Sequence, residues 1–256
     1  MLKVEIVSHV WRYSRVLAYQ LSSLVLCPPR RVRVTLRVLY ADEDKATGDV
    51  LKRFANQTPV VPTIMPRNLL LRRSIGRDMI ARKTEADVVW FTDADICFYE
   101  KALDSFATVF WQRAPLWYPD KIRQTKTRQI GDKYAAKADS AGILFVSPND
   151  CHTDTIVRAS GAYQIVPGDV CRRHGYVTDR AVDRQLVEGT DFISSRSDVR
   201  FRNQIAKLYG TPPAGKPVRI PNLVRIRQSQ FGRVDLPPVS ATRPPHLAEI
   251  AGCDTN

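Results

Sequence analysis

The sequence predicts an α/β fold, a three-layer α/β/α sandwich with a mostly parallel central sheet. Segments with strand-like and helix-like spacing alternate from the N-terminus to Asp95, which is typical of layered sheets. Residues 87–92 form a nearly continuous apolar run, as expected for a central strand covered on both faces. With 256 residues, the chain can form one large domain with a modest C-terminal extension.

Strands and helices are expected in a regular order. A short β-branched strand over 4–8 precedes a helix over 14–26, whose apolar residues have helical spacing and which the pair Pro28-Pro29 ends. The alternation continues with a strand at 32–40, a helix at 46–54, a strand at 60–65, a helix with a basic face at 69–84 and a strand at 87–92.

The pattern is looser after Asp95. We expect a helix over 102–111, a polar and basic loop over 119–139, a buried strand over 141–147 and a short strand over 163–169. Prolines accumulate from Thr211 onward, so the tail is expected to wrap around the domain or to be partly disordered.

The most informative segment is 88–95, where an apolar strand ends in two carboxylates one residue apart. Side chains two positions apart on an extended chain point the same way, so Asp93 and Asp95 converge at the edge where open α/β sheets bind ligands. A hard divalent cation, Mn²⁺ or Mg²⁺, offsets their repulsion and commonly bridges a carboxylate to substrate phosphates. The alternative is that Asp93 caps a helix and Asp95 lies in a turn. The position after a buried strand favours the metal site.

The charge balance indicates an anionic partner. Lys and Arg outnumber Asp and Glu by 39 to 26, a net charge of +13. Nucleic acid, anionic lipid headgroups or a phosphorylated substrate would each suit this charge. The sequence contains no G-x-G-x-x-G, Walker A or G-x-S-x-G pattern, which argues against P-loop, dinucleotide and serine-hydrolase chemistry.

Charged residues such as Lys3, Glu5 and Arg12 interrupt the N-terminal apolar residues, so no signal peptide is expected. No apolar run approaches the length of a membrane-spanning helix. The five cysteines are scattered without C-x-x-C spacing, which favours reduced thiols. These features predict a cytoplasmic location, or an anchor that lies elsewhere, and they leave open a peripheral contact with an anionic membrane.

Taken together, these segments resemble the GT-A glycosyltransferases, most closely the family 2 type. The resemblance spans roughly residues 3–205 and rests on the opening strand and helix, on Ser74-Ile75-Gly76-Arg77-Asp78, and on Asp93-Ala94-Asp95, which matches the family's D-x-D motif. It implies a Rossmann-like nucleotide-binding half and transfer of a sugar from a nucleoside-diphosphate-sugar donor.

The resemblance also implies roles for residues around the donor. Asp42 stands where the family usually has an acid that contacts the nucleobase, although the usual acidic-Gly-Ser turn is replaced here by Asp-Glu-Asp-Lys. Arg77 matches the arginine of the family's A-R-N helix, with Asp78 in place of Asn, but it could equally lie on a solvated helix face. His9 ends the first strand, where it contacts the nucleotide or only closes the turn. The expected donor-binding residues are Ser8, His9, Asp42, Arg77 and Asp93, and the expected metal ligands are Asp93 and Asp95.

The general base of an inverting transfer is expected at Asp198. In the resembled family, an acidic E-D pair beyond a Gly-aromatic element deprotonates the acceptor hydroxyl. Here Gly175-Tyr176 is followed by Ser197-Asp198, with Ser in place of Glu. Asp198 could instead cap the helix that follows it. Three other aspartates in the same segment compete for the role: Asp179, Asp183 and Asp191.

The predicted function is metal-dependent transfer of a sugar from a UDP- or GDP-sugar to a glycan, lipid-linked or other hydroxyl acceptor. The predicted division is a catalytic domain over 1–210, with a donor half at 1–98 and an acceptor half at 99–210, and an irregular Pro-rich extension over 211–256. One alternative is a sugar-phosphate nucleotidyltransferase, which the lack of glycine at 8–13 disfavours. The other is a basic nucleic-acid-binding protein without catalysis, although a nucleic-acid partner is the less favoured reading.

Overall fold

The computed structural model describes residues 1–110, 114–139, 142–176, 191–193 and 196–229. Seven strands of this part of the chain form one sheet in the order β10-β6-β9-β4-β1-β2-β3. Its N-terminal half contains β1 (Leu2–His9), β2 (Val32–Tyr40), β3 (Val60–Ile64) and β4 (Val88–Asp93), all parallel to one another. The other members are β6 (Trp117–Pro119), β9 (Gln164–Pro167) and β10 (Lys216–Val218), and β9 runs antiparallel to both β4 and β6.

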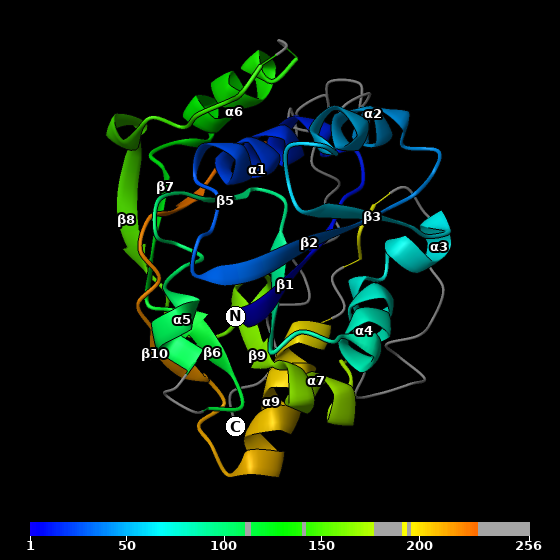
Figure 1. Cartoon of the computed structure of the whole chain (residues 1–256), viewed down its shortest axis with the longest axis vertical. Helices are drawn as coiled ribbons and strands as arrows, with labels where there is room; N and C mark the ends of the chain where they lie inside the picture. Colours follow the sequence, from blue (N-terminus) through cyan, green and yellow to red (C-terminus); the bar gives the residue numbers. More distant parts are fainter. Residues whose placement is uncertain (111–113, 140–141, 177–190, 194–195, 230–256) are drawn as a thin grey trace, which may run out of the picture.

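Helices cover both faces of this sheet, as Figure 1 shows. One face carries α1 (Ser14–Leu26) and α2 (Lys45–Phe54). The other carries α3 (Arg67–Leu70), α4 (Arg73–Lys83), α7 (Gly168–His174) and α9 (Ser197–Tyr209). The predicted three-layer α/β fold with a mostly parallel sheet is therefore confirmed.

The layers are held together by apolar side chains that the sequence places on facing surfaces. Val16, Leu17 and Leu21 of α1 are fully buried. On the opposite face, the Phe91 ring of β4 meets the Tyr176 ring edge-on at 4.8 Å, and Phe201 of α9 stacks on Tyr176 at 4.4 Å. Burial of aromatic side chains contributes strongly to core stability.

A smaller second sheet stands beside the first, in the order β5-β11-β7-β8. Its strands are β5 (Ile96–Phe98), β7 (Lys121–Thr125), β8 (Cys151–Thr155) and β11 (Leu223–Arg225). It also carries α6 (Arg128–Lys137), whereas the short helix α5 (Phe106–Val109) follows β5. Because β5 begins three residues after Asp93, the second sheet starts at the edge where β4 ends.

The structure corrects the predicted loop over 119–139. This segment forms β7 and α6 because its few apolar residues have the spacing that these elements need: Ile122 is buried on β7, and Tyr134 and Ala135 are buried on α6. The pattern was not recognised in the sequence because charged residues occupy most of the exposed positions between these apolar residues.

The predicted strand over 141–147 is also wrong in its described part, 142–147, which has no regular structure. Its amide groups bond to side chains instead of a neighbouring strand: Leu144 N donates to Ser22 Oγ at 3.0 Å, and Val146 N donates to Tyr99 Oη at 2.9 Å. The predicted helix over 69–84 is split into α3 and α4, and that over 102–111 is reduced to α5, with Trp111 outside the described residues.

Residues 211–229 wrap around the domain, which is one of the two arrangements expected for the tail. The segment contributes β10 to the first sheet and β11 to the second, and Ile220, Leu223 and Ile226 are buried. Residues 230–256 lie outside the described part of the chain. Among the described helices, none combines the length and the apolar character that a membrane crossing requires.

Candidate functional site

A cavity of about 690 Å³ lies at the carboxyl ends of β1 and β4. Its size falls in the range of about 300–1,000 Å³ that is usual for small-molecule sites. The cavity reaches from the first sheet to the second, and it is lined by His9, Tyr13, Arg73, Asp93, Ala94, Asp95, Gln124, Arg128, Asp154, Phe192, Arg225, Arg227 and Gln228. Open α/β sheets bind ligands at this edge.

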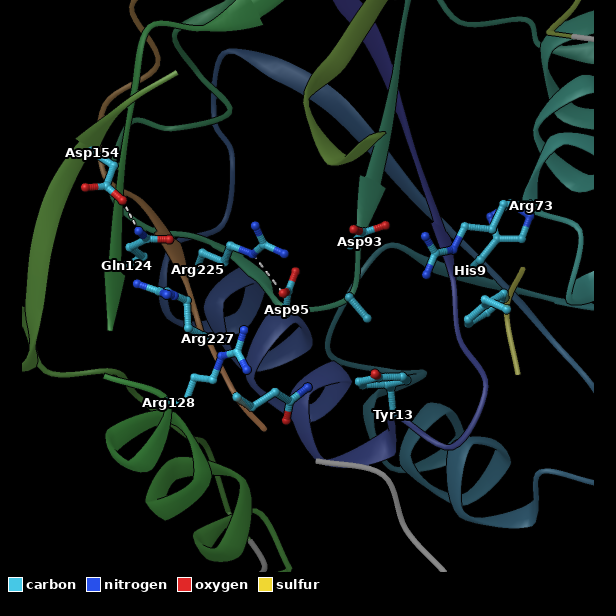
Figure 2. Close-up of a pocket in the computed structure, with 13 residues that line it drawn as sticks. His9, Tyr13, Arg73, Asp93, Asp95, Gln124, Arg128, Asp154, Arg225 and Arg227 are labelled. Atoms are coloured by element: carbon cyan, nitrogen blue, oxygen red, sulfur yellow. Dashed lines mark hydrogen bonds and ion pairs between the residues drawn. The ribbon is translucent and has the colours of Figure 1, made fainter. Parts of the chain in front are cut away.

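Asp93 and Asp95 lie in the middle of this lining (Figure 2). Asp93 is the last residue of β4, and the turn that follows is fixed by Gln20, whose Nε2 donates to the carbonyl oxygens of Asp93 and Ile96 at 3.1 and 2.9 Å. Asp95 Oδ2 accepts from Arg225 Nε at 2.9 Å, whereas Asp95 Oδ1 is buried without a hydrogen-bond partner among the described residues. Both carboxylates therefore line the same cavity, and their role as metal ligands remains a prediction.

Arg77 lies behind Asp93 and does not line the cavity. Its side chain is only 3% exposed, so the alternative of a solvated helix face is wrong. Its Nη1 donates to Tyr176 Oη at 2.8 Å, and its Nη2 lies 3.8 Å from Asp93 Oδ1. Arg77 therefore offsets part of the negative charge of Asp93, while its Nη2 has no hydrogen-bond partner among the described residues. The donor-binding role predicted for Arg77 remains a prediction.

Arg73, one helical turn before Arg77, reaches the cavity directly. Its guanidinium lies 4.3 Å from the centre of the Phe192 ring. His9 lies beside it on the same side of the cavity (Figure 2) and is 5% exposed, with no hydrogen-bond partner for either ring nitrogen among the described residues. His9 thus reaches the cavity, as its predicted donor-binding role requires.

Ser8 and Asp42 lie apart from the cavity lining. Ser8 is fully buried, and its Oγ donates to Gln20 Oε1 at 3.2 Å. The Asp42 side chain is 72% exposed and forms an ion pair with Lys45 at 3.2 Å. The buried acid of the same turn is Asp44, which caps α2 and accepts from Arg12 N at 2.6 Å. The donor-binding roles of Ser8 and Asp42 remain predictions.

Asp198 lies in the first turn of α9, after Arg196 and Ser197, and is not its capping residue. Its Oδ2 accepts from Gly161 N at 3.0 Å. Gly161 begins a short 3-10 turn that ends at Tyr163, and Tyr163 Oη accepts from Arg225 Nη1 at 3.3 Å. The turn therefore connects Asp198 to the Arg225–Asp95 ion pair. Among its competitors, Asp179 and Asp183 lie outside the described residues.

Electrostatic interactions shift the pKa values of these groups. Burial, together with the charges of Arg77 and Arg73, lowers the pKa of His9 well below its usual value, so the ring is neutral. Burial alone would raise the pKa of Asp93, but Arg73, Arg77 and Arg225 outweigh it, and the net shift is downward. At Asp95, burial and the charge of Asp93 prevail over Arg225 and raise the pKa.

The two carboxylates fit part of a divalent metal shell. Within the described residues, no three His, Cys, Asp or Glu side chains converge on one point. Mg²⁺ and similar hard ions are often held by only one or two carboxylates, and water and substrate phosphates complete the shell. Asp93 and the unpartnered Oδ1 of Asp95 suit that arrangement, while Oδ2 of Asp95 stays paired with Arg225.

Arg73 and Arg225 are among the cavity residues that were not predicted in their observed roles. In the sequence, Arg73 belongs only to the basic face of the helix expected over 69–84, and nothing indicates that Arg225 pairs with Asp95. Arg225 lies 130 positions from Asp95 in the sequence. No local pattern signals an ion pair over such a separation, because the fold alone brings the two residues together.

No protein-family model matches the sequence, and no curated protein matches it either. Solved structures do resemble it. S. aureus TarS residues 1–349 in complex with UDP has a TM-score of 0.54 and 11% sequence identity, over 90% of this chain and 59% of that chain. A second structure of the same TarS residues has a TM-score of 0.48 and 11% identity, with the same coverage.

A third similar structure is the mannosyltransferase PcManGT from Pyrobaculum calidifontis in complex with GDP-Man and Mn²⁺. Its TM-score is 0.46, with 16% identity over 88% of this chain and 56% of that chain. At such low identities, the likeness concerns the fold. This chain thus shares the α/β fold of TarS and spans 59% of the length of the TarS chain.

Proposed function

We propose that this protein is a glycosyltransferase that moves a sugar from a UDP- or GDP-sugar to an acceptor hydroxyl, with Mn²⁺ or Mg²⁺ held by Asp93 and Asp95. The observation that carries the proposal is the carboxylate pair at the end of β4, which faces a cavity of about 690 Å³. The likeness in fold to TarS, a protein crystallised with UDP, supports it.

The donor's diphosphate would bind at the Asp93 end of the cavity. When bound, the metal would neutralise the diphosphate and stabilise it as a leaving group. Arg73 reaches this end with its guanidinium, which suits contact with phosphate oxygens. Arg77 and Arg225 hold the two carboxylates in place from behind and from the side.

Asp198 is the proposed general base. The acceptor oxygen would bond to the anomeric carbon while the bond from that carbon to the diphosphate oxygen breaks, and the hydroxyl proton would pass to the carboxylate. Attack from the face opposite the leaving group would invert the anomeric configuration. This role rests on the family resemblance, because Asp198 is not among the residues that line the cavity and its Oδ2 accepts from Gly161 N.

Calorimetric titration with UDP-, GDP- and CDP-sugars tests the proposal. We expect one donor to bind when Mn²⁺ is present, and binding to be lost after chelation. Asp93→Ala should weaken binding at least about tenfold because a metal ligand is removed. Asp49→Ala is the matched control, since Asp49 is an exposed acid on α2 whose side chain is 75% accessible.

Donor binding that survives both chelation and Asp93→Ala would contradict the assigned metal site. A folded protein that binds none of the three donor classes would contradict the proposed function itself.

A further inference from the structure

The second sheet supplies a separate end to the cavity. Gln124 of β7, Asp154 of β8, Arg128 at the start of α6, and Arg227 line it, on the opposite side of Asp95 from His9 and Arg73 (Figure 2). We refer to Arg128 and Arg227 as the arginine pair. This end would remain for a second ligand when the donor's diphosphate occupies the Asp93 end.

The other charged groups near the arginine pair have partners of their own. Arg225 is paired with Asp95. Asp154 Oδ1 lies 3.1 Å from His152 Nε2, and Asp154 Oδ2 accepts from Gln124 Nε2. By contrast, neither Arg128 nor Arg227 has an ion pair with an acidic side chain in the described part of the chain. The arginine pair therefore brings two positive charges to this end, against one negative charge from Asp154.

The position of Arg227 is fixed by its main chain. Its N donates to Thr125 Oγ1 at 2.9 Å, and its carbonyl oxygen accepts from the same hydroxyl at 3.2 Å. The carbonyl also approaches α6 so closely that a Cβ on Gly131 would lie 1.6 Å from it. Fixing the backbone here limits the entropy that would be lost on binding a ligand.

The start of α6 adds to the positive potential. Arg128 is its first residue, and the Thr127 side chain caps it by accepting from Ile130 N at 3.3 Å. The unpaired amides of a helix N-terminus attract anions. Gln228, the next residue after Arg227, lines the cavity and has a buried Oε1 without a hydrogen-bond partner among the described residues. This oxygen accepts hydrogen bonds, so it suits a hydroxyl of the ligand and not its oxyanion.

We propose that the arginine pair binds an oxyanion, a phosphate or a carboxylate, carried by the acceptor. The acceptor would then be an acidic molecule whose hydroxyl is presented to the donor by charge-assisted hydrogen bonds from Arg128 and Arg227. That the ligand is the acceptor rests on the proposed function, whereas the anion site itself rests on the two arginines.

The test uses small probes titrated into the whole protein: glycerol 3-phosphate and glucuronate, with glycerol and glucose as their neutral counterparts. We expect at least one anionic probe to bind and neither neutral one. The phosphate and carboxylate probes distinguish the two chemical sources of the oxyanion. Arg128→Gln combined with Arg227→Gln should weaken anion binding at least about tenfold.

Arg123→Gln is the matched control. Arg123 precedes Gln124 on β7, so its side chain points to the opposite face of the second sheet, where it lines another cavity. Arg128→Gln alone covers the case in which the double variant fails to fold, because Arg128 is exposed. Arg123→Gln and Arg128→Gln should each keep the midpoint of thermal unfolding of the wild type. Only Arg128→Gln should weaken anion binding.

Three results would overturn the inference. The first is that no anionic probe binds the wild type, and the second is that the arginine variants bind the probe as tightly as the wild type does. The third is that the variants lose binding of nucleoside diphosphate and keep binding of the probe. The last result would assign the arginine pair to the donor. Anion binding that depends on the pair, in a protein that binds no nucleotide, would retain the anion site and refute the proposed function.

Discussion

At the scale of single residues, the site is built around charges that other side chains hold in place. Asp93 has Arg77 behind it, and Asp95 has Arg225 beside it. Arg77 in turn is held by Tyr176, whose hydroxyl accepts from Arg77 Nη1 at 2.8 Å and donates to Gln164 Oε1 at 2.6 Å. A buried cation is tolerated only with such partners.

Replacement of Tyr176 by Phe should therefore destabilise the protein. The change leaves a buried guanidinium nitrogen and the Gln164 oxygen without their partner, which costs about 1–3 kcal/mol. Urea unfolding of Tyr176→Phe measures the loss. Tyr209→Phe is the control because the Tyr209 hydroxyl bonds to His174 near the surface. Equal effects of the two changes would show that the Arg77–Tyr176 bond does not stabilise the fold.

His9 should make stability depend on pH. Its pKa is lowered in the folded protein by burial and by Arg77 and Arg73, but returns to about 6.5 on unfolding. Below that value the unfolded state binds a proton that the folded state excludes, so the free energy of unfolding falls as pH falls. The added slope is at most about 1.4 kcal/mol per pH unit.

His9→Asn removes this titration. Urea unfolding between about pH 5 and about pH 8 should give a steeper loss of stability at low pH for the wild type than for the variant. Parallel curves would show that His9 titrates alike in the folded and unfolded states.

At the scale of elements, the approach of α6 to the C-terminal segment depends on Gly131. A Cβ at this position would lie 1.6 Å from the Arg227 carbonyl oxygen, and backbone atoms cannot yield easily. Gly131→Ala should destabilise the protein by about 1–3 kcal/mol and displace Arg227 from the cavity. Thermal unfolding and anionic-probe binding measure the two effects.

Gly48 of α2 provides the contrasting case. A Cβ there would make an ordinary contact, 3.7 Å from Tyr40 Cε2. Gly48→Ala should therefore stabilise the helix by about 0.5–1 kcal/mol. If Gly131→Ala stabilised the protein as Gly48→Ala is expected to do, the close packing of α6 against the segment after β11 would be refuted.

Helices and strands were predictable where a regular apolar pattern lies within the element's own residues. The strands β1, β2 and β4 and helix α1 lie where the sequence predicts them, because each buries a regular pattern of apolar residues. The segment with β7 and α6 was misread as a loop, since few apolar residues among many charged ones are enough to pack an element onto an existing core. The segment at 142–147 was misread as a strand because side chains of α1 and of Tyr99 satisfy its amides.

At the scale of the whole molecule, the candidate site joins residues from both ends of the described chain. Asp93 and Asp95 were predictable because strand, turn and carboxylates are contiguous in sequence. The pairing of Arg225 with Asp95 and the place of Arg227 in the same cavity were not predictable, because the C-terminal segment reaches the site only by adding β11 to the second sheet between β5 and β7. The carboxylates are local features, whereas their cationic partners depend on the complete fold.

The position of the metal and nucleotide tests the central claim most directly. We would measure the anomalous scattering of Mn²⁺ in crystals of the protein grown with the nucleoside diphosphate that binds in calorimetry. We expect one Mn²⁺ peak beside Asp93 and Asp95, with the nucleotide bound in the same cavity. A nucleotide bound elsewhere, such as in the cavity of about 590 Å³ lined by Lys3, Arg37 and Lys83, would contradict it.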